Sequence, residues 1–150
     1  MAKTKKQVPI DILMATYNSN IRFLKIQIES ILNQTYKNIH LMISDDASTN
    51  PEVLEDYAKQ DERITLFFNT ENRGYLKNFE FLLQQSNAEY VAFADHDDIW
   101  YANKIKKSIE TLWAKNVDLV YCDAEQINEE GAILHKSYIE YKHMPKIEGK

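Results

Sequence analysis

The sequence predicts an α/β fold in which strands and helices alternate around a mostly parallel central sheet. Two observations support this fold class. Short apolar runs alternate along the chain with segments whose apolar residues recur every three or four positions. With 3 glycines and 3 prolines, and with no internal repeat or low-complexity tract, the chain has no flexible linker that would interrupt this alternation. This alternation is typical of parallel sheets, because each helix returns the chain to the end where the next strand starts.

The first part of the chain predicts three strands, each followed by a helix. The predicted strands are 10–15, 39–43 and 63–68, and the predicted helices are 21–32, 51–60 and 75–85. Asn18, Ser19 and Asn20 are candidate caps for the first helix, and Pro51 suits the start of the second. The third helix is predicted to bury four apolar residues, which are Leu76, Phe79, Leu82 and Leu83.

The second part of the chain predicts fewer elements. They are a strand over 90–94, a helix over 101–114 and a strand over 117–122. The strand over 90–94 is apolar on both faces, which is typical of a central strand covered by helices. Cys122, at the end of the last strand, is predicted to be a small core residue. Beyond residue 126 the pattern fades, apart from a turn at 129–131.

The length of 150 residues fits a single domain. We expect a basic N-terminal tail at 1–8, the main domain at 9–128, and an incomplete C-terminal segment at 129–150 that can be partly disordered. The tail carries Lys3, Lys5 and Lys6, for which a solvated role and a weak attraction to anionic lipid are both open.

Composition excludes some classes of protein. The net charge of −5 argues against a nucleic-acid partner, which needs a concentrated basic surface. A single cysteine cannot form an internal disulfide, so no oxidising compartment is needed. No stretch approaches the roughly 18 apolar residues of a membrane-spanning helix, and the start lacks the apolar run of a signal peptide. We therefore expect a cytoplasmic location, with peripheral membrane association at the inner face of the cell membrane as an option.

Polar clusters follow three of the predicted strands, at the point where each strand ends. In parallel sheets of this kind, ligands bind at the carboxyl ends of the strands. We therefore expect these groups to converge on one rim of the sheet. They are Thr16, Tyr17 and Asn18 after the first strand, Asp45 and Asp46 after the second, and Asp95, Asp97 and Asp98 after the fourth.

The acidic residues of this rim favour a divalent cation. Two carboxylates about 4 Å apart repel by about 4 kcal/mol at an effective dielectric near 20, so the cluster needs a counter-charge. Mg²⁺ and Mn²⁺ prefer carboxylate and phosphate oxygens, and a diphosphate can complete such a shell. His96 is a weaker candidate ligand, because its side chain should point away from Asp95 and Asp97 if strand geometry continues. The alternative is a purely structural role, in which Asp45 and Asp46 are only turn or cap residues.

Other residues near the rim suit a nucleotide. Tyr17 can stack on a base or simply pack, and Asp46 can accept hydrogen bonds from a base N–H or a ribose hydroxyl. Arg73 and Lys77 can neutralise phosphate, although a solvated role is the default for both.

Four short motifs in order resemble the family 2 glycosyltransferases, which are inverting enzymes with a GT-A fold. The motifs are Met14-Ala15-Thr16-Tyr17-Asn18, Ser30-Ile31-Leu32-Asn33-Gln34-Thr35-Tyr36, Ser44-Asp45-Asp46-Ala47-Ser48 and Asp95-His96-Asp97-Asp98-Ile99-Trp100. The resemblance covers roughly residues 9–128. The last motif is most similar to bacterial rhamnosyltransferase-type members that build surface polysaccharides.

The resemblance implies a role for each matched residue. Thr16, Tyr17, Asp45 and Asp46 would border the nucleoside, and Asp95 would lie near the ribose and diphosphate. Asp97 would be the principal metal ligand, with Asp98 close to the metal or the acceptor. Asn18 and Arg73 complete the nucleotide-binding residues that we expect. The cofactor would be Mg²⁺ or Mn²⁺, the donor a UDP- or dTDP-sugar, and the acceptor a glycan or a lipid-linked glycan.

The resemblance also implies a missing part. Family members are longer, and their catalytic base is a carboxylate well downstream of the Asp-x-Asp motif. Glu125, Glu129 and Glu130 follow the motif too closely by that comparison, so we expect the base beyond residue 150. The chain would then be a donor-binding part that can be inactive alone.

Two other classes of protein remain open at this point. A receiver-like phosphoacceptor domain also clusters Asp residues at strand ends, but its acidic pair follows the first strand and its lysine after the fifth strand is not evident here. A nucleotidyltransferase shares the sheet style and the metal use. It usually carries a glycine-rich loop near the first strand, whereas Gly74 is the first glycine of this chain.

Overall fold

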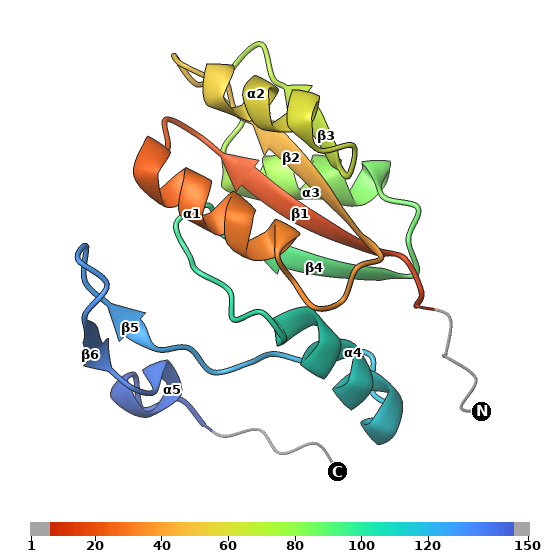
Figure 1. The fold of residues 1–150 in the computed structure, drawn as a ribbon, viewed down its shortest axis with the longest axis vertical. Helices are drawn as coiled ribbons and strands as arrows, with labels where there is room; N and C mark the ends of the chain where they lie inside the picture. Colours follow the sequence, from red (N-terminus) through yellow and green to blue (C-terminus); the bar gives the residue numbers. More distant parts are fainter. Residues whose placement is uncertain (1–6, 146–150) are drawn as a thin grey trace. The chain divides into compact units, whose positions relative to one another are not determined.

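The computed structural model of the protein describes residues 7–145 and shows a chain with two compact units (Figure 1). The first unit extends to Lys104, and the second starts at Ile105. The boundary therefore lies inside the range 9–128 that the sequence assigned to one domain, and that assignment stays a prediction. The lysines of the predicted basic tail lie outside the described residues.

The first unit is built on a parallel sheet of four strands, which confirms the predicted α/β class. The strand order is β3-β2-β1-β4. The strands are β1 (Ile10–Thr16), β2 (Ile39–Asp45), β3 (Ile64–Phe68) and β4 (Tyr90–Ala94). Because all four run in one direction, the polar residues that follow them lie at the same rim.

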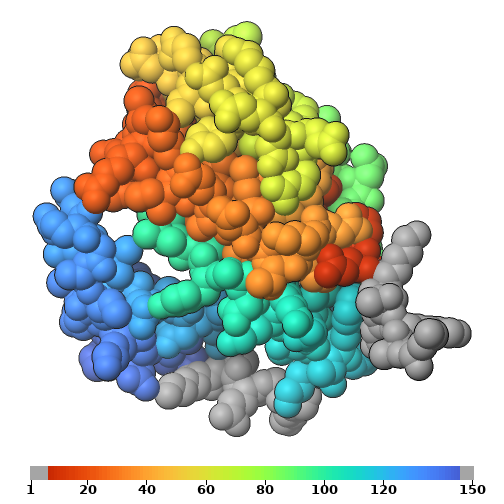
Figure 2. Space-filling model, viewed as in Figure 1, coloured from red at the N-terminus to blue at the C-terminus, as the bar shows by residue number. Residues whose placement is uncertain are grey.

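Three helices cover the sheet. They are α1 (Ile21–Leu32), α2 (Glu52–Gln60) and α3 (Tyr75–Gln85). Helix α3 packs against β1 and β2 through the apolar cluster of Leu13, Met42 and Leu82. Helices α1 and α2 cover the opposite face, where Figure 2 shows their side chains in orange and yellow.

Local sequence explains where these helices begin. Asn20 has an extended backbone, and its side chain accepts a hydrogen bond from the Arg22 N–H, so it is the cap predicted for α1. Helix α2 begins at Glu52, with Pro51 as the preceding cap residue. Helix α3 follows Gly74, whose φ of +83° is in the left-handed region that favours glycine.

Two packing predictions for the first unit are wrong. Strand β4 is not central, because it forms one edge of the described sheet, and its residues Val91 and Phe93 are exposed. Within α3, Leu82 is buried, but Leu76 is 68% exposed and Leu83 is 43% exposed. Apolar character alone did not reveal which face of the strand and helix would find a neighbour.

The second unit contains short elements that the sequence did not predict, apart from its first helix. They are α4 (Lys104–Lys115), which starts three residues later than predicted, the antiparallel pair β5 (Gln126–Ile127) and β6 (Ile133–His135), and α5 (Tyr138–Tyr141). The predicted turn at 129–131 is confirmed: Asn128 O accepts the Gly131 N–H, and Gly131 has a φ of +84°.

The strand predicted over 117–122 is wrong. No strand forms there in the described residues, Leu119 is 80% exposed, and Cys122 is exposed rather than in the core. An apolar segment becomes a strand only where a neighbouring strand offers hydrogen-bond partners, and the local sequence does not report that neighbour. None of the described helices combines the length and the apolar character that crossing a membrane requires.

Candidate functional site

The ends of β1 and β2 are joined by a side-chain hydrogen bond. Thr16 and Asp45 are partners in the strand register, and the Thr16 hydroxyl donates to Asp45 Oδ1 at 2.9 Å. Both residues are buried. The predicted convergence of the first two polar clusters on one rim is therefore present in the structure.

The Asp45 carboxylate also shapes the loop that follows it. Its Oδ2 accepts the Ser48 N–H at 2.8 Å, and its Oδ1 accepts the Ser48 hydroxyl at 2.6 Å. Ala47, inside this turn, has a φ of +64°. The carboxylate thus stabilises a tight turn with a left-handed residue, which is the structural role that the sequence allowed for Asp45.

Asn18 ties the loop after β1 to the loop after β2. Its N–H donates to Ser48 Oγ at 2.8 Å, and its side-chain oxygen accepts the Thr49 N–H at 3.0 Å. Asn18 has a φ of +44°, a conformation that asparagine tolerates better than most residues. The two loops are therefore held together without a ligand.

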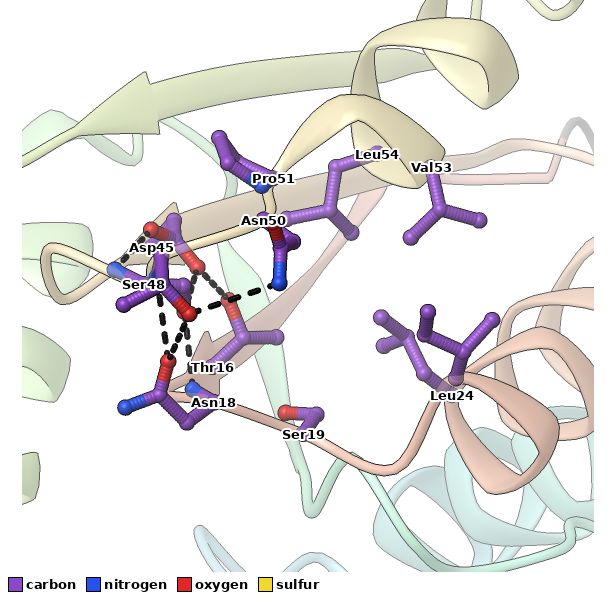
Figure 3. Close-up of a pocket in the computed structure, with 12 residues that line it drawn as sticks. Thr16, Asn18, Ser19, Leu24, Asp45, Ser48, Asn50, Pro51, Val53 and Leu54 are labelled. Carbon is purple, nitrogen blue, oxygen red and sulfur yellow. Dashed lines mark hydrogen bonds between the residues drawn. The ribbon is translucent and has the colours of Figure 1, made fainter.

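A pocket of about 160 Å³ lies between these two loops. Figure 3 shows the polar side chains of Thr16, Asn18, Asp45 and Ser48 on one side, with Leu24 opposite Val53 and Leu54. The hydroxyl oxygen of Ser19, which also lines the pocket, is buried and has no hydrogen-bond partner in the described residues. A pocket with an apolar wall, a polar wall and an unused hydroxyl suits a small ligand with a flat ring and polar edges.

Asp46 is directed away from this pocket and into the protein. Its Oδ1 accepts hydrogen bonds from the Asn69 side chain at 2.8 Å and the Arg73 N–H at 2.9 Å, and its Oδ2 accepts the Gly74 N–H at 2.8 Å. Burial opposes ionisation, but these hydrogen bonds and the Arg73 charge outweigh it and lower the pKa of Asp46. The carboxylate that the sequence offered to a base or ribose is thus already engaged by the segment before α3.

The other predicted nucleotide residues lie at the surface. Tyr17 is 50% exposed, so its ring is not a core packing element. The side chains of Arg73 and Lys77 are exposed. Their positions leave all three able to meet a ligand from solution.

The acidic residues after β4 differ from those after β2. Asp95, Asp97 and Asp98 are exposed, and among residues 7–145 no hydrogen bond reaches their carboxylates. Desolvation of the Asp98 carboxyl and the nearby charges of Asp95 and Asp97 raise the pKa of Asp98, and the charges of Lys104 and His96 oppose that shift without cancelling it. The repulsion among the carboxylates is therefore offset only in part.

These carboxylates do not form a complete metal site by themselves. Within the described residues, no three acidic, histidine or cysteine side chains come close enough together to hold an ion. The imidazole Nδ1 of His96 is buried and has no hydrogen-bond partner in that part of the chain. An ion at this rim would need further oxygen ligands from outside the chain.

Sequence reasoning missed the residues that support both acidic groups. Asn69 and Asn78 hold the segment next to Asp46. Gln27 and Ser30 of α1, and Gln34 just after it, contact the main chain after β4. A signal was available, because Gln27 interrupts the apolar stripe of Leu24, Ile28 and Ile31 on α1. A polar residue on a buried helix face usually has a fixed partner.

Comparison with known sequences identifies a matching family. The sequence profile described as "Glycosyl transferase family 2" matches residues 11–149. An Escherichia coli protein, "UDP-Glc:alpha-D-GlcNAc-diphosphoundecaprenol beta-1,3-glucosyltransferase WfgD", is 31% identical over 83% of this chain and 49% of its own length. The "putative teichuronic acid biosynthesis glycosyltransferase TuaG" of Bacillus subtilis is 27% identical over 85% of this chain and 51% of its own length.

Solved structures share the fold. A mannosyltransferase of Pyrobaculum calidifontis, solved with GDP-Man and Mn²⁺, aligns with a TM-score of 0.66 and 22% identity over 71% of this chain and 33% of its own. TarS of S. aureus, solved with UDP-GlcNAc, aligns with a TM-score of 0.65 and 18% identity over 89% of this chain and 42% of its own. The chain therefore spans about half the length of the curated relatives named above and less of these structures.

Proposed function

Because the chain belongs to glycosyltransferase family 2, we propose that it is the donor-binding part of an enzyme that transfers a sugar, with inversion, from a nucleotide diphosphate. The acceptor in this proposal is a glycan or lipid-linked glycan of a bacterial cell surface. The family match and the GT-A fold of the solved relatives do not favour the receiver-like and nucleotidyltransferase alternatives. The rhamnosyltransferase-type subgroup stays a prediction.

The observation that carries the proposal is the rim formed by three parallel strands. A preformed pocket lies after β1 and β2, and exposed carboxylates follow β4, which is the next strand beside β1. The pocket suits a nucleoside, and the exposed, mutually repelling carboxylates suit a cation that carries the diphosphate. One rim thus offers separate places for the two ends of a nucleoside diphosphate.

In this proposal the nucleoside occupies the pocket, where it meets Thr16, Asn18 and Asp45. Tyr17 stacks from the exposed side, and Arg73 faces the phosphates. Asp46 supports the site indirectly, because its hydrogen bonds hold the segment that carries Arg73. This role replaces the direct contact with base or ribose that the resemblance implied for Asp46.

The exposed carboxylates fit a hard divalent cation, Mg²⁺ or Mn²⁺. Their oxygens are the ligand type that both ions prefer, and the charges on Asp95 and Asp97 that raise the pKa of Asp98 are those a cation would offset. Asp97 would be the principal ligand, with Asp95 and Asp98 beside it, and diphosphate oxygens would complete the shell. A bound ion would neutralise charge that develops on the departing nucleoside diphosphate.

The relatives support the choice of ligands. The name of the E. coli relative states a UDP-linked glucose donor, and the P. calidifontis structure contains a nucleotide sugar and Mn²⁺. We carry a UDP- or dTDP-sugar and a divalent metal to this chain as part of the proposal. The catalytic base and the acceptor site would belong to parts of a longer enzyme beyond residue 150.

Thermal shift and calorimetry with UDP, dTDP and GDP, each with Mn²⁺ or with EDTA, test the proposal. We expect UDP or dTDP to raise the Tm, and Mn²⁺ to increase that rise. Asp97→Ala should remove the Mn²⁺-dependent part. Glu89→Ala is the matched control, because this exposed acid precedes the same strand at its other end. No shift with any of the three nucleotides at millimolar concentration would refute the proposed function.

A further inference from the structure

We propose that three polar residues, two in α1 and one just after its end, position the carboxylates that follow β4 for metal binding. The residues are Gln27, Ser30 and Gln34, here called the α1 polar clamp, and the segment that they hold is residues 95–102, here called the acidic loop. The inference rests on the proposed function and assigns a task to the motif that begins at Ser30, which that function leaves without one.

Three hydrogen bonds join the clamp to main-chain atoms of the acidic loop. Gln27 Nε2 donates to the carbonyl of Asp95 at 2.9 Å, and the Ser30 hydroxyl oxygen accepts the Trp100 N–H at 3.0 Å. Gln34 Nε2 donates to the carbonyl of Tyr101 at 2.9 Å. The clamp therefore holds the loop at both ends and leaves the carboxylates between them unengaged.

The clamp residues also organise one another. The Ser30 hydroxyl lies 2.8 Å from both the carbonyl oxygen and Oε1 of Gln27, so it can donate to either oxygen of that residue while it accepts from Trp100. Immediately after α1, the Thr35 N–H donates to the carbonyl of Ala102 at 2.7 Å. The result is a connected set of hydrogen bonds in which each partner fixes the orientation of the next.

Burial shows that the clamp is more than a surface contact. The side chains of Gln27 and Gln34 are 0% exposed, although glutamine is usually at the surface. Burying an amide is unfavourable unless its hydrogen bonds are made, and an apolar residue at either position would pack on the core without that requirement. The amides therefore serve to specify the loop, because burial alone would be easier to achieve with leucine or methionine.

Helix α1 also lines the nucleoside pocket, through Ile21 and Leu24 near its start. One rigid helix thus contacts both the proposed nucleoside pocket and the acidic loop. A nucleoside diphosphate has a limited reach from base to phosphates, so the two places must stay within that reach of each other. We infer that α1 sets the distance between the nucleoside pocket and the acidic loop. The clamp is the part of this arrangement that attaches the acidic loop to α1.

The variants Gln27→Met and Ser30→Ala test this inference in the full 150-residue chain. Methionine keeps the length and volume of Gln27 but has no amide donor. Ile28→Val is the matched control, because Ile28 is also 0% exposed on α1 but makes no hydrogen bond to the acidic loop. Mn²⁺ binding in the presence of UDP is measured from the loss of the free Mn²⁺ electron paramagnetic resonance signal. UDP binding in EDTA is measured by calorimetry.

We expect both clamp variants to weaken Mn²⁺ binding by about tenfold, the lower end of the effect of removing a residue that supports metal ligands. UDP affinity in EDTA should change by less than about twofold, since the pocket is intact. Amide hydrogen exchange at Trp100 should become faster in Ser30→Ala. Ile28→Val should lower the Tm without changing either affinity, which separates positioning from general destabilisation.

Three results would overturn the inference, and they have different meanings. If the unmodified chain binds UDP and Mn²⁺ but both clamp variants bind Mn²⁺ equally well, the clamp does not position the loop and the proposed function stands. If the unmodified chain binds neither ligand, the proposed function fails and the inference fails with it. An equal loss of UDP affinity in EDTA would also refute the inference, because it would indicate general damage.

Discussion

The carboxylates after β2 and those after β4 lie at the same rim but are held in opposite ways. Asp45 and Asp46 are buried, and every one of their oxygens accepts a hydrogen bond from the chain. The carboxylates of Asp95, Asp97 and Asp98 are exposed, and the chain holds that loop through its main chain instead. The first pair stabilises the loops at the rim, and the second group remains accessible to a ligand.

The difference shows that an acidic residue at the end of a strand does not by itself indicate a metal site. A carboxylate that already accepts hydrogen bonds on both oxygens is stabilised little by a cation. Exposed carboxylates that repel one another are stabilised more, because the cation offsets their repulsion. Substitutions in the two groups should therefore have different effects on the stability of the fold and on ligand binding. Substitutions after β2 should affect folding first, and substitutions after β4 should affect binding first.

The largest stability effect is expected for Asp46→Ala. The substitution removes the acceptor of the Arg73 N–H and one acceptor each of the Asn69 amide and the Gly74 N–H. Those two keep hydrogen bonds of 3.1 Å to the side chains of Asn78 and Asn72. We expect a loss of about 3 kcal/mol in the free energy of unfolding, since each buried donor left unpaired costs about 1–3 kcal/mol and water can reach some of them. Urea denaturation followed by circular dichroism measures it. A loss below about 1 kcal/mol would show that the segment before α3 does not depend on this carboxylate.

A smaller effect is expected for Thr16→Val, which keeps the shape of the side chain. It removes the hydroxyl that donates to Asp45, while the two hydrogen bonds from Ser48 to Asp45 remain. The free energy of unfolding should fall by about 1 kcal/mol, the usual net contribution of one such hydrogen bond. The same urea titration measures it, with Thr111→Val on the exposed surface of α4 as control. An effect as large as that of Asp46→Ala would mean that the junction of β1 and β2 depends on this single bond.

The smallest stability effect is expected for Asp98→Asn. The carboxylate is exposed and accepts no hydrogen bond in the described part of the chain, so the free energy of unfolding should stay within about 0.5 kcal/mol of the unmodified value. The Tm increase caused by Mn²⁺ with UDP should nevertheless become smaller. Differential scanning calorimetry with and without both ligands measures the two quantities together. A clear loss of stability without ligand would place Asp98 with Asp46 and remove the contrast between the regions.

Much of the first unit could be predicted from local sequence. The four strands and three helices before residue 95 lie within one or two residues of their predicted ranges, because apolar periodicity and caps act over a few neighbouring positions. Asn20 is a good example, since its capping bond reaches a residue only two positions away. The same local reading was wrong for 117–122, where a strand would have needed a partner that the periodicity does not specify.

The position of the candidate site at one rim of the sheet could be predicted. Which acidic residues support the fold and which face a ligand could not. The sequence placed Asp45, Asp46, Asp95, Asp97 and Asp98 at strand ends. Which of them face a ligand depends on donors elsewhere in the chain, such as the Gly74 N–H that is 28 residues from Asp46. The clamp residue Gln27 is 68 residues from the carbonyl that it contacts, so the local pattern can mark Gln27 as a polar residue on an apolar stripe but cannot identify its partner.

The sequence by itself determined the alternation of strands and helices, the family, and the order in which polar groups follow the strands. These properties depend on residue type and on spacing over a few positions. Only the tertiary structure decided that β4 forms an edge of the described sheet, that Asp46 is directed into the protein, and that α1 holds the acidic loop. Those outcomes depend on hydrogen bonds and contacts between distant segments, which exist only after the helices have packed on the sheet.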